Sequence, residues 1–184
     1  MPQHRIAISG GRGSGKSTCF QALIERMNKR QLSFSGFKTF FLNAEALWLE
    51  WINRSESTIL MSQKTGKQSM RPVLENLDKI GKRLMQIEWH SKCFVADEIG
   101  FLEQLSKRLQ RGIYKAVTDA PFSIFTIKNV DYPFLKQLKK LERIQIVDLD
   151  PMDWQQKDAI IKSLLGELDA YQSPIMTKIS HKSP

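Results

Sequence analysis

Cysteine and histidine are scarce in this chain of 184 residues. Cys19 and Cys93 are the only cysteines and form no C-x-x-C pair, which excludes a disulfide framework and a cysteine-rich zinc site. His4, His90 and His181 have no metal-ligand spacing and fit no Ser-His-Asp arrangement. We therefore expect both thiols to be structural and the chain to work in a reducing interior, with the cytoplasm as the default location.

Long apolar runs are also missing. No run approaches the ~20 residues that span a bilayer, and a glycine-rich loop follows the N-terminus too closely to leave room for a signal-peptide core. Hydrophobic residues make up 41% of the chain and charged residues 26%, as in soluble globular domains. We expect one domain over residues 1–172, a polar tail over residues 173–184, and no membrane interaction.

Acidic residues are outnumbered, with 19 Asp and Glu against 28 Lys and Arg, and the formal net charge is +9. Such an excess favours a polyanionic ligand. The cations are spread over several expected helices, and no RNA-binding signature of basic and aromatic residues accompanies them. We expect mostly solvated basic faces, keep nucleic acid as a minor alternative, and leave a protein partner open.

A phosphate-binding pattern, GxxxxGK(S/T), directly follows the apolar stretch of residues 6–8. Its glycines let backbone N–H groups point at the α- and β-phosphates, and the next helix adds the positive end of its dipole. Lys16 reaches the β- and γ-phosphates, and the Ser17 hydroxyl binds Mg²⁺. The pattern predicts a nucleoside triphosphate site. Its expected binding residues are Gly10, Gly11, Arg12, Gly13, Ser14, Gly15, Lys16, Ser17 and Thr18.

Apolar strands and amphipathic helices alternate along the chain, which predicts an α/β fold with a mainly parallel sheet and helices on both faces. Residues 44–72 are less regular and give no clear element. The expected strands cover residues 5–9, 33–43 with a break at Gly36, 93–97, 123–127 and 144–147. The expected helices carry residues 20–27, residues 71–87 starting at Arg71-Pro72, residues 102–113 as one helix, a short helix led by Pro133, and residues 154–168.

An acidic pair, Asp97-Glu98, ends the apolar strand of residues 93–97. Parallel strands place their carboxyl ends at one edge of the sheet, so Asp97 should emerge beside the phosphate loop. There it would hold a Mg²⁺-bound water, with Ser17 as a direct ligand. Glu98 could accept a proton from the attacking water or orient it.

Three segments resemble the small nucleoside-triphosphatase family known as the thermophilic, or cancer-related, NTPase. Residues 94–103 look like the family's DEIGxxE signature, and residues 34–39 resemble its GF-x-T segment. Residues 124–128, followed by a Pro-led helix, match the order of elements downstream of that signature in the family. The resemblance covers most of residues 4–168. At the start of the last helix this chain has Asp153-Trp154, where the family often has Asn-Arg.

The resemblance implies Mg²⁺-dependent hydrolysis of ATP, GTP and other triphosphates, with weak base preference. It also implies a three-layer P-loop fold with an extra strand between the two motif strands and a catalytic glutamate. Glu98 would be that glutamate, acting together with Lys16, and Asp97 the metal-side carboxylate.

Two other functions share the phosphate loop. A small-molecule kinase would need an acceptor pocket and usually an arginine-rich lid that excludes water. A nucleotide-gated binding module would use bound triphosphate to order residues 44–72 for a protein or RNA partner.

Two details of the site stay open in the sequence. The second cation at the phosphates could be Arg12 or Lys128, with Lys38 and Arg71 as weaker candidates. Trp48 and Trp51, three residues apart as on a helix, favour core or interface packing over stacking on a base.

Overall fold

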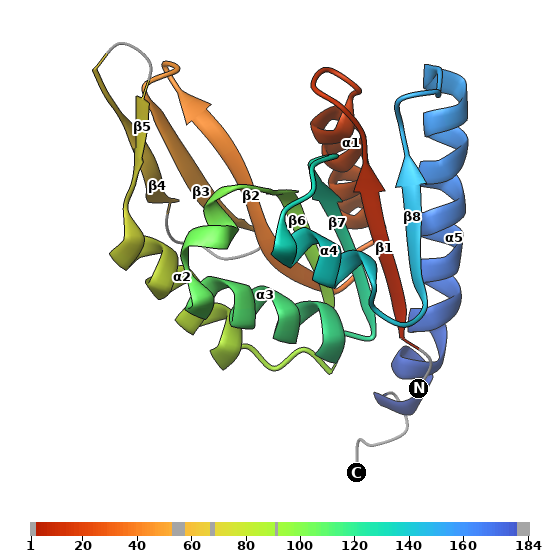
Figure 1. The fold of residues 1–184 in the computed structure, drawn as a ribbon. Coiled ribbons are helices and arrows are strands. Elements are labelled where there is room, and N and C mark those ends of the chain that lie inside the picture. Colours follow the sequence, from red (N-terminus) through yellow and green to blue (C-terminus); the bar gives the residue numbers. More distant parts are fainter. Residues whose placement is uncertain (1–2, 53–57, 67–68, 91, 180–184) are drawn as a thin grey trace.

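Eight strands form a single sheet in the computed structural model, which describes residues 3–52, 58–66, 69–90 and 92–179. The strand order is β5-β4-β3-β2-β6-β7-β1-β8 (Figure 1). The strands are β1 (His4–Ser9), β2 (Phe34–Leu42), β3 (Ala46–Ile52), β4 (Thr58–Thr65), β5 (Ser69–Pro72), β6 (Cys93–Ile99), β7 (Phe122–Ile127) and β8 (Ile144–Asp148).

The predicted α/β fold with a mainly parallel sheet is confirmed. Strands β2, β6, β7, β1 and β8 run parallel to one another. Strand β7 lies between β1, which leads into the phosphate loop, and β6, which carries the acidic pair. This is the extra strand that the family resemblance implied, and both motifs lie at the carboxyl edge of the sheet.

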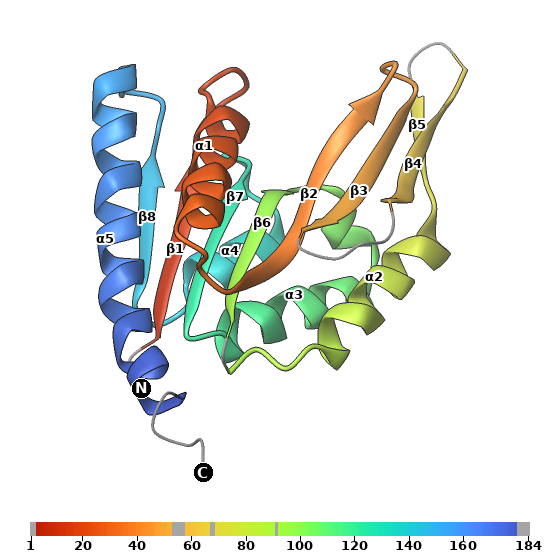
Figure 2. The ribbon, with the colours of Figure 1, turned by 180° about the vertical axis from the view of Figure 1, so that it is seen from behind.

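Residues 44–72 are more regular than the sequence suggested. Strands β3, β4 and β5 extend the sheet by three antiparallel pairings that begin at β2 (Figure 2). Their alternation is hard to read because the β3–β4 register shifts between Leu47 and Trp48, which interrupts the period of two. Residues 53–57 and 67–68 lie outside the described residues.

The helical placement of the two tryptophans is wrong, since both lie on β3. The core interpretation holds for Trp51, which is buried, meets the Phe37 ring edge-on at 6.3 Å and lies 4.5 Å from the Arg83 guanidinium carbon.

The start of the helix after β5 also differs from the expectation. Residues Arg71 and Pro72 belong to β5, so the helix begins at Leu74, three residues after Arg71.

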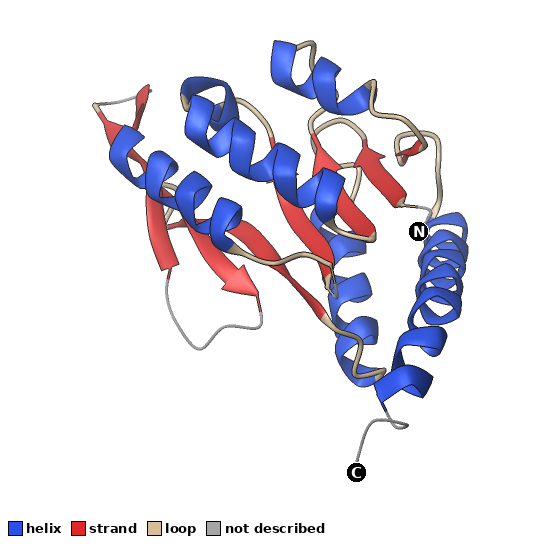
Figure 3. Cartoon of the chain, turned by 90° about the horizontal axis from the view of Figure 1, so that it is seen from below, coloured by secondary structure: helices blue, strands red, loops and turns tan. Residues whose placement is uncertain are grey.

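Helices cover both faces of the sheet (Figure 3). Helices α1 and α5 pack on one face and α2, α3 and α4 on the other, which gives two apolar cores separated by the sheet. No helix in the described ranges is long and apolar enough to span a bilayer. The helices are α1 (Lys16–Lys29), α2 (Leu74–Gln86), the 3-10 helix η1 (Leu102–Leu105), α3 (Lys107–Asp119), α4 (Pro133–Lys139) and α5 (Trp154–Ile179).

Two helix boundaries depart from the expectation. The single helix expected over residues 102–113 is divided into η1 and α3, because the Ser106 hydroxyl accepts a hydrogen bond from Leu109 N (2.9 Å) and caps α3. At the other end of the chain, α5 continues to Ile179, into residues 173–184 that were expected to form the tail. Residues 180–184 lie outside the described residues.

Gly36 lies where β2 meets β6. It adopts φ +154°, and a Cβ atom there would stand 1.7 Å from the Val95 carbonyl oxygen. The break that the sequence suggested at Gly36 is therefore a point of close backbone approach within one continuous strand.

Candidate active site

The phosphate loop lies between β1 and the N-terminus of α1. Gly13 (φ +80°) and Gly15 (φ +87°) adopt left-handed conformations that other residues rarely take. Gly15 caps α1, and its carbonyl accepts the hydrogen bond of Cys19 N (2.8 Å). The glycines therefore turn the chain so that residues 10–18 meet at the positive end of the α1 dipole.

The Lys16 side chain folds back over this loop. Its ammonium donates to the Gly10 and Gly11 carbonyls, both at 2.7 Å, and lies 3.4 Å from Ser14 Oγ. These contacts hold a positive charge among the backbone groups of the loop, as the binding of a triphosphate requires.

Two residues that sequence reasoning missed brace the loop from the segment after β8. Asp150 accepts the hydrogen bond of Gly11 N on both carboxylate oxygens, at 2.8 and 2.9 Å. Lys157, in the first turn of α5, donates to the Ser14 carbonyl (2.8 Å). Neither residue belongs to a motif, and only the fold brings them across from positions about 140 residues away in the chain.

A capping box starts α5 where the family often has Asn-Arg. Gln156 N donates to Asp153 Oδ1 (2.8 Å), while Asp153 N donates to Gln156 Oε1 (2.9 Å). Trp154 follows the cap and is exposed. The D-x-x-Q spacing is the sequence signal that fixes the start of α5, and thereby the position of Lys157.

The acidic pair lies in a bulge at the end of β6. The β6–β7 register shifts between Ala96 and Ile99, and Glu98 has φ +62°. Thr126 of β7 holds both acidic residues: its hydroxyl donates to Asp97 Oδ1 (2.8 Å) and accepts from Glu98 N (2.6 Å). Because of the bulge, the two consecutive carboxylates have different neighbours.

Asp97 is buried, with 6% of its surface exposed, and lies beside the phosphate loop. Burial raises the pKa of Asp97 above its usual value, although hydrogen bonds from Thr126 and Ser17 and the charge of Lys16 act in the opposite direction. The segments at residues 16–17 and 97 thus meet in space, as the sequence predicted.

The ligand chemistry at this point suits Mg²⁺. A hydroxyl and a carboxylate are hard oxygen ligands, and Mg²⁺ takes one or two carboxylates together with waters and substrate phosphates. In the described parts of the chain, no group of three or more His, Cys, Asp or Glu residues could hold a metal ion. Ser17 could bind such an ion directly and Asp97 could hold one of its waters.

Glu98 points to a different partner. Its Oε1 lies 2.6 Å from the Lys128 ammonium, and both side chains remain partly exposed. The Lys128 stem lies along Gly100, where a Cβ atom would come within 3.1 Å of Lys128 Cδ. Glycine at position 100 therefore lets the lysine reach Glu98.

Two of the other candidate cations, Lys38 and Arg71, lie on the antiparallel part of the sheet. Lys38 pairs with Glu50 (3.1 Å) on the antiparallel side of the sheet, and Arg71 is exposed on β5. Arg12 is exposed at the tip of the phosphate loop. The structure thus places Lys128 beside Glu98, and Lys157 beside the loop.

Glu103 supports the turn that follows the acidic pair. Its side chain is buried, and its Oε2 accepts the hydrogen bond of Gly100 N (2.6 Å). Burial raises the pKa of Glu103 to about 7. This residue is the second glutamate of the DEIGxxE segment.

A pocket of about 150 Å³ opens beside Glu98. Its walls are mostly apolar and come from β2 to β5 on one side and from residues 98–103 on the other. Phe41 and Phe101 lie at this pocket and are largely exposed, while Glu98 and Lys128 form its polar side.

Comparisons with known proteins agree with this geometry. A family model described as NTPase matches residues 5–165. Nucleoside-triphosphatase THEP1 of Thermotoga maritima is 24% identical over 176 residues, which cover 89% of this chain and 95% of that protein.

Two solved structures share the fold. The crystal structure of THEP1 from the hyperthermophile Aquifex aeolicus superposes with a TM-score of 0.71 at 22% identity, over 90% of this chain and 99% of that one. The solution structure of a human cancer-related nucleoside triphosphatase gives a TM-score of 0.69 at 12% identity, over 91% and 98%. With the matched model spanning nearly the whole domain, the chain belongs to the NTPase family of nucleoside-triphosphate-hydrolysing P-loop enzymes.

Proposed function

We propose that this protein hydrolyses ATP, GTP or a related triphosphate to the diphosphate and inorganic phosphate in a Mg²⁺-dependent reaction. The observation that supports this most directly is the meeting of Lys16 and Ser17 with the buried Asp97, one residue before Glu98. Proteins that bind a nucleoside triphosphate together with Mg²⁺ combine a phosphate loop, a hydroxyl and a carboxylate in this way.

The loop supplies binding and charge. Backbone N–H groups of residues 10–18 would contact the α- and β-phosphates, and Lys16 would exchange its carbonyl partners for oxygens of the β- and γ-phosphates. Lys157 lies close enough to the loop to add a second positive charge. Ser17 would hold Mg²⁺ directly and Asp97 would hold one of its waters, and the bound ion would supply positive charge to offset the charge that develops on the phosphate oxygens.

Glu98 would position the attacking water and accept its proton. The new bond joins the water oxygen to the γ-phosphorus, and the bond from that phosphorus to the β–γ bridging oxygen breaks, leaving the electron pair on the diphosphate. The ammonium of Lys128 lies 2.6 Å from Glu98 Oε1 and orients the carboxylate for this role.

Steady-state phosphate release, measured with ATP and GTP in the presence of Mg²⁺, tests the proposal. We expect Glu98→Gln to bind nucleotide but to turn over about 10²–10⁴-fold more slowly, a barrier increase of about 3–5 kcal/mol. Lys16→Ala should lose nucleotide binding as well.

Glu45→Gln is the matched control, because Glu45 is another exposed glutamate that pairs with a lysine, Lys64, at 3.0 Å. It should turn over like the unmodified protein. Wild-type turnover by Glu98→Gln would remove Glu98 from the mechanism. Nucleotide binding without turnover by the unmodified chain would favour a binding module over an enzyme.

The pocket beside Glu98 supports a second candidate, a small-molecule kinase. An acceptor hydroxyl in this pocket would take the place of water, give its proton to Glu98 and receive the γ-phosphoryl group. A volume of about 150 Å³ suits one small ring or short aliphatic chain. Diphosphate formation that exceeds phosphate release in the presence of small alcohols would favour this candidate, and equal rates would favour hydrolysis.

A further inference from the structure

A groove on the α3–α4 side of the molecule lies apart from the site described above. It consists of two adjoining hollows, of about 380 Å³ between α3 and α4 and about 550 Å³ at the beginnings of β1 and β8. Tyr114 and Thr118 of α3 line both hollows and join them. Since the phosphate loop follows the far end of β1, the second hollow lies at the opposite edge of the sheet.

Positive side chains outnumber acidic ones in the lining of this groove. The sequence suggested cations dispersed over several faces, but the fold gathers a group of them here. Asp119 and Glu142 are the acidic residues among those that line the two hollows. The cations that line them are Lys107, Arg111, Lys115, Lys140, Arg143 and Arg5.

Three of these cations form a stripe along α3. Lys107, Arg111 and Lys115 follow one another at intervals of four residues, so each lies about 6 Å further along the helix axis than the one before. Lys115 pairs with Asp119 (2.6 Å). For Lys107 and Arg111, the described parts of the chain show no ion pair or hydrogen bond of the side chain.

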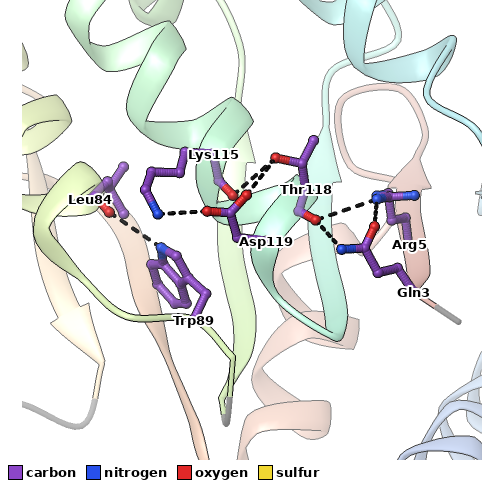
Figure 4. A network of polar contacts seen from close by, with 7 residues as sticks. All are labelled: Gln3, Arg5, Leu84, Trp89, Lys115, Thr118 and Asp119. Carbon is purple, nitrogen blue, oxygen red and sulfur yellow. Dashed lines mark hydrogen bonds and ion pairs between the residues drawn. The ribbon is translucent and has the colours of Figure 1, made fainter. Parts of the chain in front are cut away.

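A network of hydrogen bonds adjoins the second hollow, and Figure 4 shows part of it around Gln3 and Arg5. Arg5 is 8% exposed and donates to the backbone carbonyls of Val117 (3.2 Å) and Glu142 (2.7 Å). Gln3 bonds both Arg5 and the Thr118 carbonyl. These contacts join the end of α3 to the start of β1 and to the segment that leads into β8.

Tyr114 adds an aromatic ring at the junction of the hollows. It is half-buried and follows Arg111 by three residues, on the same side of α3 as the stripe. A regular row of cations with an interleaved aromatic ring is the combination by which proteins bind single-stranded nucleic acid: the cations contact successive phosphates, and a base stacks on the ring.

We propose that this groove binds single-stranded nucleic acid, with the phosphates along the stripe of Lys107, Arg111 and Lys115 and a base against Tyr114. The binding is of the sequence-independent kind, because the groove offers charge and one stacking surface. It does not depend on nucleotide hydrolysis, since no residue of the groove belongs to the phosphate loop or the acidic pair.

Fluorescence anisotropy with a labelled oligouridylate of about twelve nucleotides tests this, without added nucleotide and at several salt concentrations. The test variant is the double substitution Lys107→Glu with Arg111→Glu. The matched control is Lys29→Glu with Lys82→Glu, which changes the net charge equally but alters exposed residues of α1 and α2 outside the groove.

We expect a dissociation constant in the range of about 10⁻⁴–10⁻⁶ M at physiological salt for the unmodified protein. The test variant should bind at least tenfold more weakly, and its salt slope should be smaller by about 1.4. The control should stay within threefold. Equal losses in both variants, or no binding by the unmodified protein, would overturn the proposal.

A second comparison separates nucleic acid from other polyanions. Tyr114→Leu should weaken binding of the oligouridylate and of the matching oligothymidylate, but not of inorganic polyphosphate. If Tyr114→Leu leaves the binding of both oligonucleotides unchanged, the ring does not stack on a base and the nucleic-acid assignment is wrong. Circular dichroism melting curves of all variants show whether each one is folded.

Discussion

Glu98 combines a strained backbone with an exposed, charged side chain. A non-glycine residue in the left-handed region costs about 1–2 kcal/mol, and φ +62° at Glu98 lies in that region. The hydrogen bond from Glu98 N to Thr126 Oγ1 offsets part of this cost. In return, the bulge directs Asp97 toward Ser17 and Glu98 toward Lys128, so that one short segment serves two roles.

Glu103 gives the stability of the fold a dependence on pH. Folding raises the pKa of Glu103 from 4.5 to about 7, so the folded state holds its proton more tightly than the unfolded state does. The stabilising contribution of this group is therefore complete below about pH 4.5 and is lost as the pH rises through about 7.

Glu103→Gln should remove this dependence, because a carboxamide does not titrate. We expect the free energy of unfolding of the unmodified protein to fall relative to that of Glu103→Gln between about pH 5 and about pH 8. Urea unfolding at several pH values measures the difference, with exposed Glu45→Gln as the control. A constant difference across this range would show that Glu103 keeps the same protonation state in the folded and unfolded protein.

Sequence predicts those site residues whose chemistry lies in a local motif. The phosphate loop and the Asp97-Glu98 pair were found because glycine spacing and an apolar strand identify them. Thr126, Asp150 and Lys157 were missed because a threonine in a strand, an aspartate in a loop and a lysine on a helix are ordinary residues. Their roles arise from long-range contacts that no local pattern records.

Helices α2 and α3 approach one another through glycines. A Cβ atom at Gly81 would lie 2.4 Å from the Arg108 carbonyl oxygen, and one at Gly112 would lie 2.5 Å from the Gly81 carbonyl oxygen. Each glycine lowers helix propensity by about 1 kcal/mol relative to alanine, but it allows the two helices to approach more closely.

Gly81→Ala should destabilise the protein despite the better helix propensity of alanine. The new methyl group meets backbone rather than a flexible side chain, and such overpacking costs about 1–3 kcal/mol or more, which exceeds the gain of about 1 kcal/mol. Gly166→Ala on α5 is the control, because a Cβ atom there would have no neighbour within 4 Å. Chemical denaturation should show a loss for the first variant and a gain for the second. The same sign for both would mean that α2 and α3 separate at little cost.

At the level of elements, the parallel half of the sheet was predictable and the antiparallel half was not. Strands β1, β6 and β7 are buried apolar runs, which a sequence displays directly. Strand β5 is mostly exposed, and the β3–β4 pairing contains a register shift, so neither shows a clean alternation. Helix boundaries depended on caps such as Ser106, which divided the one helix expected over residues 102–113.

The assembled domain should gain stability from its ligand. If Mg²⁺ and ATP bind at the loop and at Asp97, ATP at a hundred times its dissociation constant should add about 2.7 kcal/mol, or about 5–10 °C in the melting temperature of a domain of this size. Differential scanning fluorimetry should show this shift for the unmodified protein and for Glu98→Gln. Lys16→Ala, or removal of Mg²⁺ with a chelator, should reduce it. An undiminished shift in the chelator would mean that the ion contributes nothing to binding.

Strand β2 joins the parallel and antiparallel parts of the sheet, because it pairs in parallel with β6 on one edge and in antiparallel fashion with β3 on the other. The phosphate loop and the acidic pair lie on the parallel side, while much of the apolar wall of the pocket beside Glu98 lies on the antiparallel side. At Gly36, β2 approaches β6 more closely than any residue with a Cβ atom would allow. If the proposed reaction takes place beside Glu98, substitutions in the antiparallel half of the sheet would change what fits next to the γ-phosphate without altering the phosphate loop.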